Sequence, residues 1–293
     1  MQSTTRRNLP AVGTSTEYAP ASHASRSERG GDMGHIGQWA DLTSTELAAL
    51  DRAQAVAILP IGAVEQHGPH LALSVDRDLT LAVLTRTLPL IDPVLTVLAL
   101  PVQAIGKSTE HHSWPGTLSL SADTMLRLLR DIAASVQRAG ILRLMVLNGH
   151  GGNRALLELA CRDLRAELSL ITAHVAWDDL AGAEKIVGEA EARNGLHAGD
   201  VETSAMLAAH PEKVRMEWAD DFGSAHLNWH KAHPDLGLDA AALRPGWLMA
   251  DLNPKGAVGN AKAATAEKGD ALLDNAANGL ARRVADFARF QPG

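Results

Sequence analysis

The segment Ala55–Ile61 (Ala-Val-Ala-Ile-Leu-Pro-Ile) constrains the fold most, because it contains no polar side chain and ends at Gly62. An apolar run of this length, closed by a glycine, is typical of a strand buried on both faces of a sheet. Such a strand needs helices on both sides of the sheet. Shorter or similar apolar runs predict further strands at residues 94–102, 141–147 and 170–177.

Helical patterns separate these strands. Thr43–Glu46 has the form of a capping box that opens a short helix, and Asp78 has the position of an N-cap for a helix ending near Leu88. Further helices are predicted at 121–139, with Ser121 or Asp123 as the cap, at 153–168 and at 265–290. Strands that alternate with helices predict a single α/β unit, a three-layer fold with a mostly parallel sheet flanked by helices.

Composition and charge exclude several classes of partner. The 293 residues carry a net charge of −7, and the part expected to fold has no basic cluster, so nucleic acid and anionic membranes are poor partners. No apolar run approaches the ~20 residues of a membrane span. The single cysteine, Cys161, fits a reducing compartment, and its helical surroundings favour a packed side chain over a nucleophile.

The N-terminal residues differ from the rest of the chain. Residues 1–35 are rich in Ser, Thr, Ala and Arg and lack apolar periodicity, which predicts a disordered tail before one domain at 36–293. Arg6-Arg7 hints at an export signal, but no hydrophobic segment follows it. We therefore expect a cytoplasmic protein.

Three polar segments adjoin the predicted elements. Glu65-Gln-His67-Gly-Pro-His70 follows the first buried strand, Asn148-Gly-His150-Gly-Gly-Asn153 follows the strand at 141–147, and His197-Ala-Gly-Asp-Val-Glu202 precedes a helical stretch. Ligands in open α/β sheets bind beyond the carboxyl ends of the strands. Carboxylates and imidazoles together form the ligand set of Zn²⁺ or Mn²⁺. The segments therefore indicate a metal site, although each one alone is also typical of an exposed loop or turn.

The spacing of the polar residues supports a metal site. Glu65 and His67 are two residues apart and project to the same side of an extended segment. A Gly-Pro turn then allows the chain to return to the site with Asp76, and His150 lies between glycines, where the backbone can approach a ligand closely. A phosphate-binding loop is a weaker interpretation of the two glycines after His150, because neither a Walker Lys-Ser/Thr nor a Gly-x-Gly-x-x-Gly pattern is present.

The same motifs resemble the creatininase family. The resemblance rests on Leu59–Leu71 with Asp76, on Asn148–Asn153, on His197–Ser204 and on Trp114–Ser119, and it spans about Trp39 to Phe290 in the family's order. It implies a creatininase-like fold and a metal-dependent amidohydrolase that holds two divalent ions, Zn²⁺ and/or Mn²⁺, with Fe²⁺ as a further option. It also implies a homo-oligomer such as a hexamer, and a small amide as the substrate.

The resemblance assigns roles to individual residues. Glu65, His67, Asp76 and His150 are expected to hold the ions, with Asp76 between them. His197 matches the histidine that passes a proton to the leaving nitrogen after a water molecule, activated by the ions, attacks an amide carbonyl.

Three further residues complete the expected site. Glu202 lies five residues beyond His197 at the start of a helix, where we expect it to complete the second metal site and to take part in catalysis. His111 and Trp177 are expected in the wall of the substrate pocket, although Trp177 fits the apolar core equally well.

The chain departs from the creatinine-hydrolysing members of the family. Gly151 and Gly152 stand where those members carry an aromatic residue and a glutamate, and Arg193 stands where they carry a tryptophan. Creatinine is therefore not the expected substrate. A small cyclic or linear amide, a linear formamide and a short peptide cleaved in cofactor maturation remain. A metal-binding scaffold is the alternative without catalysis.

Overall fold

The computed structural model describes residues 34–238 and 243–292. The expected tail therefore lies outside the described residues, except for its last two positions. The amide of Gly34 donates to Pro93 O, and His35 O accepts from the amide of Val97. These two residues are thus joined to the sheet.

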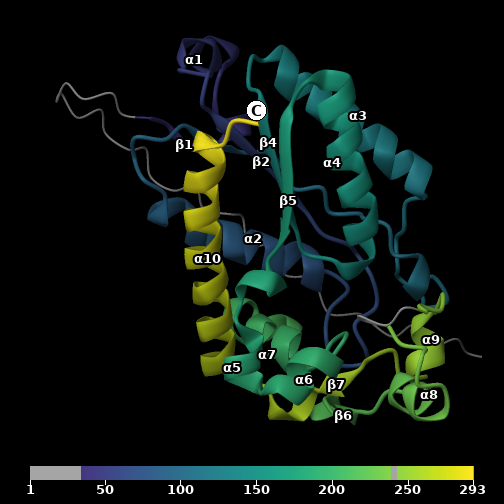
Figure 1. Cartoon of the computed structure of the whole chain (residues 1–293). Coiled ribbons are helices and arrows are strands. Elements are labelled where there is room, and N and C mark those ends of the chain that lie inside the picture. The colour runs from purple at the N-terminus through teal and green to yellow at the C-terminus, as the bar shows by residue number, and fades with distance from the viewer. Residues whose placement is uncertain (1–33, 239–242, 293) are drawn as a thin grey trace, which may run out of the picture. The chain divides into compact units, whose positions relative to one another are not determined.

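Strands and helices alternate through the first half of the described chain, and short helices fill much of the second half (Figure 1). The strands and α-helices are β1 (Ile36–Gln38), α1 (Ser44–Ala49), β2 (Val56–Ile61), α2 (Val75–Thr87), β3 (Val97–Ala99), α3 (Ala122–Arg138), β4 (Arg143–Asn148), α4 (Arg154–Leu168), β5 (Ile171–Ala176), α5 (Ala183–Val187), α6 (Glu189–Asn194), α7 (Asp200–Ala209), β6 (Asp221–Phe222), α8 (His226–Ala232), α9 (Met249–Leu252), β7 (Gly259–Asn260) and α10 (Ala266–Arg289).

The main sheet is parallel throughout and has the strand order β1-β3-β2-β4-β5. β2 and β4 pair along their whole length, from Val56 opposite Arg143 to Ile61 opposite Asn148. From β2 the chain moves outward to β3 and then returns to β4 on the other side of β2. The carboxyl ends of β2 and β4 therefore flank the point where the strand order reverses, which is where ligands bind in such sheets.

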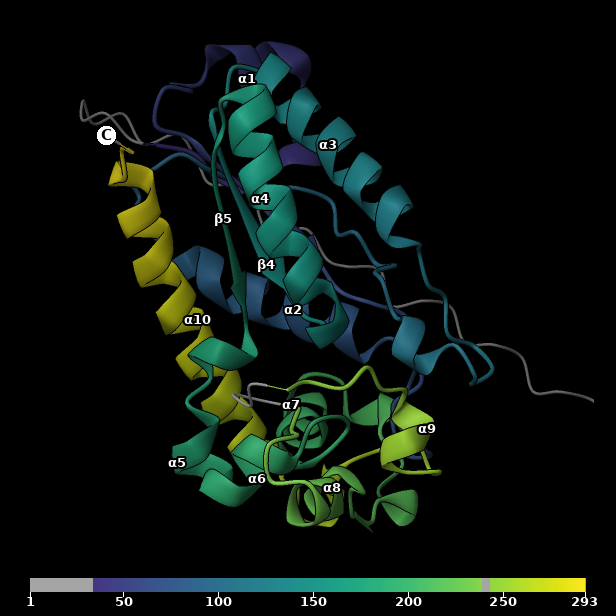
Figure 2. The same ribbon diagram turned by 45° about the vertical axis from the view of Figure 1, so that its right-hand side comes forward.

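Two hydrophobic cores cover the two faces of this sheet. Val56 and Ile58 of β2 belong to the core under α2, α7 and α10, whereas Ala57 and Leu59 belong to the core under α3 and α4. Successive side chains of a strand point to opposite faces, so a fully apolar strand is what two cores require. Figure 2 shows α3 and α4 on one side of the sheet and α10 on the other. The predicted three-layer α/β fold is confirmed.

The predicted start of α2 is wrong. The helix begins at Val75, so Asp78 lies within its first turn and is not its N-cap. The Asp78 carboxylate instead accepts hydrogen bonds from Ser74 Oγ at 2.6 Å and from Lys213 Nζ at 2.7 Å, and it pairs with Arg77. These contacts tie α2 to the segment that follows α7. They also hold the pKa of Asp78 below its usual range: burial alone would raise it, but the bonds from Lys213, Ser74 and Arg77 outweigh burial.

Other boundaries differ less. The strand predicted at 94–102 pairs regularly only over Val97–Ala99, and β1, which has three residues, was not predicted. The capping box of Thr43 and Glu46 and the N-cap Ser121 are present as expected. Thr265, which was predicted only as the first residue of the last helix, is the N-cap of α10.

We predict that Asp78→Ala lowers the free energy of unfolding by about 2 kcal/mol or more, because it removes charged hydrogen bonds to a buried carboxylate. Since the folded-state pKa of Asp78 is depressed, its contribution is present above the unfolded-state pKa of about 4 and is lost as pH falls through the folded-state pKa. Urea unfolding at neutral and acidic pH measures both effects. Asp123→Ala, which removes an exposed pair with Arg127, is the control and should cost less than about 0.5 kcal/mol.

Candidate metal centre

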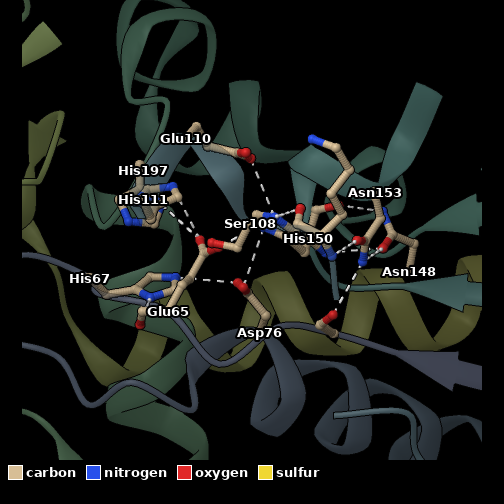
Figure 3. Close-up of polar contacts among 12 residues, drawn as sticks. Glu65, His67, Asp76, Ser108, Glu110, His111, Asn148, His150, Asn153 and His197 are labelled. Atoms are coloured by element: carbon tan, nitrogen blue, oxygen red, sulfur yellow. Dashed lines mark hydrogen bonds and ion pairs between the residues drawn. The ribbon is translucent and has the colours of Figure 1, made fainter. Parts of the chain in front are cut away.

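The predicted ligand segments meet beyond the carboxyl ends of β2 and β4 (Figure 3). Glu65 and His67 follow β2, Asp76 lies in the first turn of α2, His150 follows β4, and His197 precedes α7. All five residues are at most 7% exposed. The structure therefore brings five side chains, from three segments that lie far apart in the sequence, into one buried cluster.

Asp76 lies between two histidines. Its Oδ1 is 3.2 Å from Nε2 of His67, and its Oδ2 is 3.4 Å from Nδ1 of His150. Glu65 adds a second carboxylate on the His150 side, with Oε2 3.3 Å from His150 Nε2. A carboxylate whose two oxygens face two different imidazoles has the arrangement expected of a ligand shared by two ions.

Several polar atoms of this cluster have no hydrogen-bond partner among the described residues. They are both carboxylate oxygens of Glu65, Nε2 of His67 and Oδ2 of Asp76. Buried polar groups in proteins are nearly always paired, so an unpaired set calls for another partner. One donor atom from each of these three residues lies within 4.8 Å of the others. Because carboxylates and imidazoles bind divalent transition metals, the set fits a divalent cation.

The raised pKa values of Glu65, His67 and His150 indicate that positive charge is stabilised in this cluster. Burial lowers the pKa of His67, but the carboxylates of Asp76 and Glu202 outweigh burial and raise it to about 10. Burial also lowers the pKa of His150, and Glu65 and Glu110 raise it to about 10. Burial raises the pKa of Glu65 to about 8. Without a cation, bound protons supply the charge that the carboxylates require.

Two asparagines hold the His150 segment in place. Asn148 Nδ2 donates to His150 O at 2.7 Å, and the His150 amide donates to Asn148 Oδ1 at 3.2 Å. Asn153 Nδ2 donates to Asn148 Oδ1 and to Gly62 O, both at 3.1 Å, which ties the segment to the end of β2. Gly149 is needed because an added Cβ would lie 2.0 Å from Oγ1 of Thr80 in α2. The Asn-Gly-His-Gly-Gly-Asn motif thus fixes the position of one imidazole.

Gln66 orients two further histidines. Its Oε1 accepts from the Gly68 amide at 2.9 Å, so its Nε2 faces Nδ1 of His111 at 2.7 Å and must donate. His111 then carries its proton on Nε2, which lies 3.3 Å from Glu65 Oε1. His197 donates from Nε2 to Gln66 O at 2.7 Å and turns a bare Nδ1 toward Glu65 Oε1 at 3.7 Å. Burial, with His67 and His111 nearby, holds the pKa of His197 well below its usual value, so the ring is neutral.

Glu202 lies on the His67 side of the cluster. Its Oε1 is 3.9 Å from Nε2 of His67, and its Oε2 accepts from the amide of Ala198 at 2.6 Å. Ala198 has a left-handed backbone (φ 54°), a conformation that costs about 1 kcal/mol or more outside glycine and that is often found at functional sites. Glu202, His67 and His197 together offer three donor atoms within 4.8 Å of one another.

The cluster opens into a cavity of about 800 Å³. His111, Trp177 and Glu202 reach its wall, and so do Lys185 and Arg193 from the α5–α6 region. His111 is buried inside the cluster, so it contacts Glu65 as well as lining the cavity. Trp177 is 2% exposed, belongs to the hydrophobic core and also borders the cavity.

Comparison with known proteins places this arrangement in a family. The family model described as creatinine amidohydrolase matches residues 40–284. The chain belongs to the creatininase family. It is 33% identical over 242 residues to the mycofactocin precursor peptide peptidase of Mycobacterium ulcerans (strain Agy99), an overlap of 80% of this chain and 86% of that protein. It is 30% identical over 243 residues to the creatinine amidohydrolase of Pseudomonas putida, and this match covers 78% of this chain and 88% of that protein.

A solved structure named "Creatininase Mn" superimposes with a TM-score of 0.68 at 27% identity, and the match covers 88% of this chain and 99% of that chain. These creatininase-family relatives are hydrolases of C–N bonds, and this chain is an enzyme of the same kind. Its clustered carboxylates and imidazoles offer ligand groups for a divalent metal. No helix among residues 34–238 and 243–292 is long and apolar enough to cross a membrane.

Two residues of this creatininase-family site were not predicted from the sequence. Gln66 lies between two predicted ligands, but an amide in a motif gives no sign that it orients histidines. Glu110 lies 3.4 Å from His150 with Oε1 facing Nε2. Its only signal was its place beside His111 in the segment before Trp114. Cys161, in contrast, lies in α4 away from the cluster, and burial raises the pKa of its thiol to about 11, which does not suit a nucleophile.

We predict that metal affinity rises with pH. The pKa values of His67 and His150 are raised to about 10 in the folded protein without metal, so a cation must displace protons from both rings. As pH rises, fewer protons compete with the cation for the two rings. The binding constant should therefore rise about tenfold per pH unit for each proton that the cation displaces. Chelator competition at about pH 7 and about pH 9 measures the change, and calorimetry in two buffers counts the protons released. An affinity independent of pH would contradict these assignments.

Proposed function

We propose that this protein is a metal-dependent hydrolase of the C–N bond in a short peptide or a similarly extended linear amide. The observation that carries the proposal is the cavity of about 800 Å³ beside the metal centre. Cavities that hold drug-sized ligands measure about 300–1,000 Å³, whereas creatinine is a single five-membered ring. The similarity to a precursor peptide peptidase supports a peptide over a cyclic amide.

Two features of the cavity wall support an extended substrate. Gly151 has no other atom within 4 Å of the place where its Cβ would be, so this part of the wall is open. Lys185 and Arg193 bring positive charge to the cavity, and Arg193 stands where creatinine-hydrolysing members are expected to carry an apolar tryptophan. A guanidinium suits a carboxylate, so we propose that the free carboxyl end of a peptide lies on this side.

The residues of the chain have distinct proposed tasks. Divalent ions, when bound, supply an activated water molecule and polarise the amide carbonyl. Asp76, Glu65 and His150 would hold one ion, and Asp76, His67 and Glu202 the other.

His197 would manage the proton of the leaving nitrogen. Its Nε2–H is already donated to Gln66 O, so proton exchange with the substrate would take place at Nδ1. A neutral ring with a bare Nδ1 can first accept a proton and then pass it to the nitrogen that departs. We further propose Zn²⁺ or Mn²⁺ as the ions and, from the family resemblance, a cytoplasmic homo-oligomer such as a hexamer.

We predict about two divalent ions per chain by elemental analysis of gently purified protein. Asp76→Asn keeps the shape of the side chain but removes the charge between His67 and His150, so it should lose metal from both sides and abolish turnover. Asp78→Asn is the matched control, since it alters the neighbouring acid and should lower stability but leave metal content unchanged. Less than half an equivalent in the wild type, with none regained on adding Zn²⁺ or Mn²⁺, would overturn the metal assignment.

We predict that the metal-loaded enzyme hydrolyses short peptides at least about a hundredfold faster than creatinine. Mass spectrometry of reactions with creatinine, a lactam, a formamide and a peptide library measures the preference. Arg193→Ala should raise KM about tenfold or more for peptides with a free carboxyl end, with little change in kcat, because it removes binding remote from the reacting bond. Carboxyl-amidated peptides are the control and should show no such change. Faster turnover of creatinine or of a formamide would contradict the peptide assignment.

A further inference from the structure

Glu110 brings a further carboxylate to the metal centre from outside the three predicted ligand segments. It lies in the 3-10 turn Thr109–His111, and its side chain is 15% exposed. Its Oε1 is 3.4 Å from Nε2 of His150 (Figure 3). The Glu110 carboxylate thus lies beside His150, which is a metal ligand under the proposed function.

The two nitrogens of His150 face different surroundings. Nδ1 faces Oδ2 of Asp76, an oxygen without a hydrogen-bond partner among the described residues. Nε2 lies 3.0 Å from Lys107 O, a carbonyl that can only accept, so Nε2 carries the proton. Two carboxylates lie beside this same N–H: Glu110, and Glu65, whose Oε2 is 3.3 Å from Nε2. Histidines that bind a metal through one nitrogen generally direct the other N–H to a carbonyl or carboxylate, which fixes the ring and strengthens the ligand.

Gly152 makes room for the Glu110 carboxylate. A Cβ at position 152 would lie 2.1 Å from Oε1 of Glu110, 2.4 Å from Nε2 of His150 and 2.8 Å from Lys107 O. A Cβ atom essentially never comes this close to atoms to which it is not bonded, so a side chain at 152 requires Glu110 or His150 to shift. Gly151 differs, because an added Cβ there would meet nothing within 4 Å.

We propose that Glu110 is a positioning residue of the metal centre: together with Lys107 O it orients His150 and raises its affinity for a cation, and Gly152 is glycine to allow this contact. This inference rests on the proposed function in that His150 must be a metal ligand. The negative charge beside Nε2 favours the positive charge that the ring acquires when Nδ1 binds a cation. Glu110 therefore acts through His150 and does not itself hold the ion.

The test is a Zn²⁺ affinity measured by chelator competition on the full-length protein, after the metal has been removed and added back. Glu110→Gln keeps the shape and removes the charge, and we expect affinity to fall about 10- to 100-fold while about two ions still bind at saturation. Glu184→Gln removes an equal charge from the wall of the same cavity and should change affinity less than about twofold. The melting temperature of the metal-free Glu110→Gln variant should match that of the wild type, which separates metal positioning from a structural role.

Position 152 gives an independent measurement. Gly152→Ala should weaken Zn²⁺ binding as much as Glu110→Gln or more, whereas Gly151→Ala should leave it unchanged. Because both changes disturb one contact, the double variant Glu110→Gln with Gly152→Ala should bind no more than about twofold more weakly than Gly152→Ala alone.

The outcomes separate the two levels of inference. A wild-type protein that binds no metal overturns the proposed function. A wild type that binds two ions, beside a Glu110→Gln variant of equal affinity, overturns only the role of Glu110. Loss of a whole equivalent of metal from Glu110→Gln would make Glu110 a ligand and would also overturn the positioning role.

Discussion

The carboxylates of Glu65 and Asp76 lie almost without solvent exposure among imidazoles at the ends of β2 and β4, and much of the surrounding structure serves to keep them there. Burying an ionised carboxylate costs several kcal/mol unless a charge partner compensates. The described residues leave four polar atoms of this cluster unpaired. The cost of burying these carboxylates is therefore offset only when cations or protons bind in the cluster. The raised pKa values of His67, His150 and Glu65 reflect this preference for bound protons.

Main-chain carbonyls orient three of the histidines. His67 Nδ1 donates to Glu65 O, His150 Nε2 to Lys107 O and His197 Nε2 to Gln66 O, at 2.7 to 3.1 Å. Each ring consequently turns its other nitrogen toward the cluster. A main-chain carbonyl can only accept a hydrogen bond and does not titrate, so the position of the backbone determines which ring nitrogen carries the proton. His111 is the exception, because it is held by the side chain of Gln66.

The sequence was sufficient for four of the five strands of the main sheet, and for the convergence of the ligand residues, because these depend on strong local signals. The length and flanks of Ala55–Ile61 favour a doubly buried strand, and motifs that follow parallel strands meet at one sheet edge. The start of α2 was misplaced because Asp78 resembles a cap, and only the tertiary contact with Lys213 reveals its task. Glu110 was missed because a single acid in a turn has no periodicity, and its importance arises from a histidine 40 residues away in sequence.

The space beside Gly152 has a consequence for how related active sites can diverge. An acidic side chain at 152 and the carboxylate of Glu110 would occupy the same volume, because a Cβ at 152 would lie only 2.1 Å from Oε1 of Glu110. A descendant of this chain that gained a glutamate at 152 would first pass through a crowded intermediate unless residue 110 had already become small. The two positions should therefore change together, because a side chain at 152 displaces the carboxylate of Glu110. Lineages with an acid at one position should carry a small residue at the other, so the pair would mark a branch point within the family.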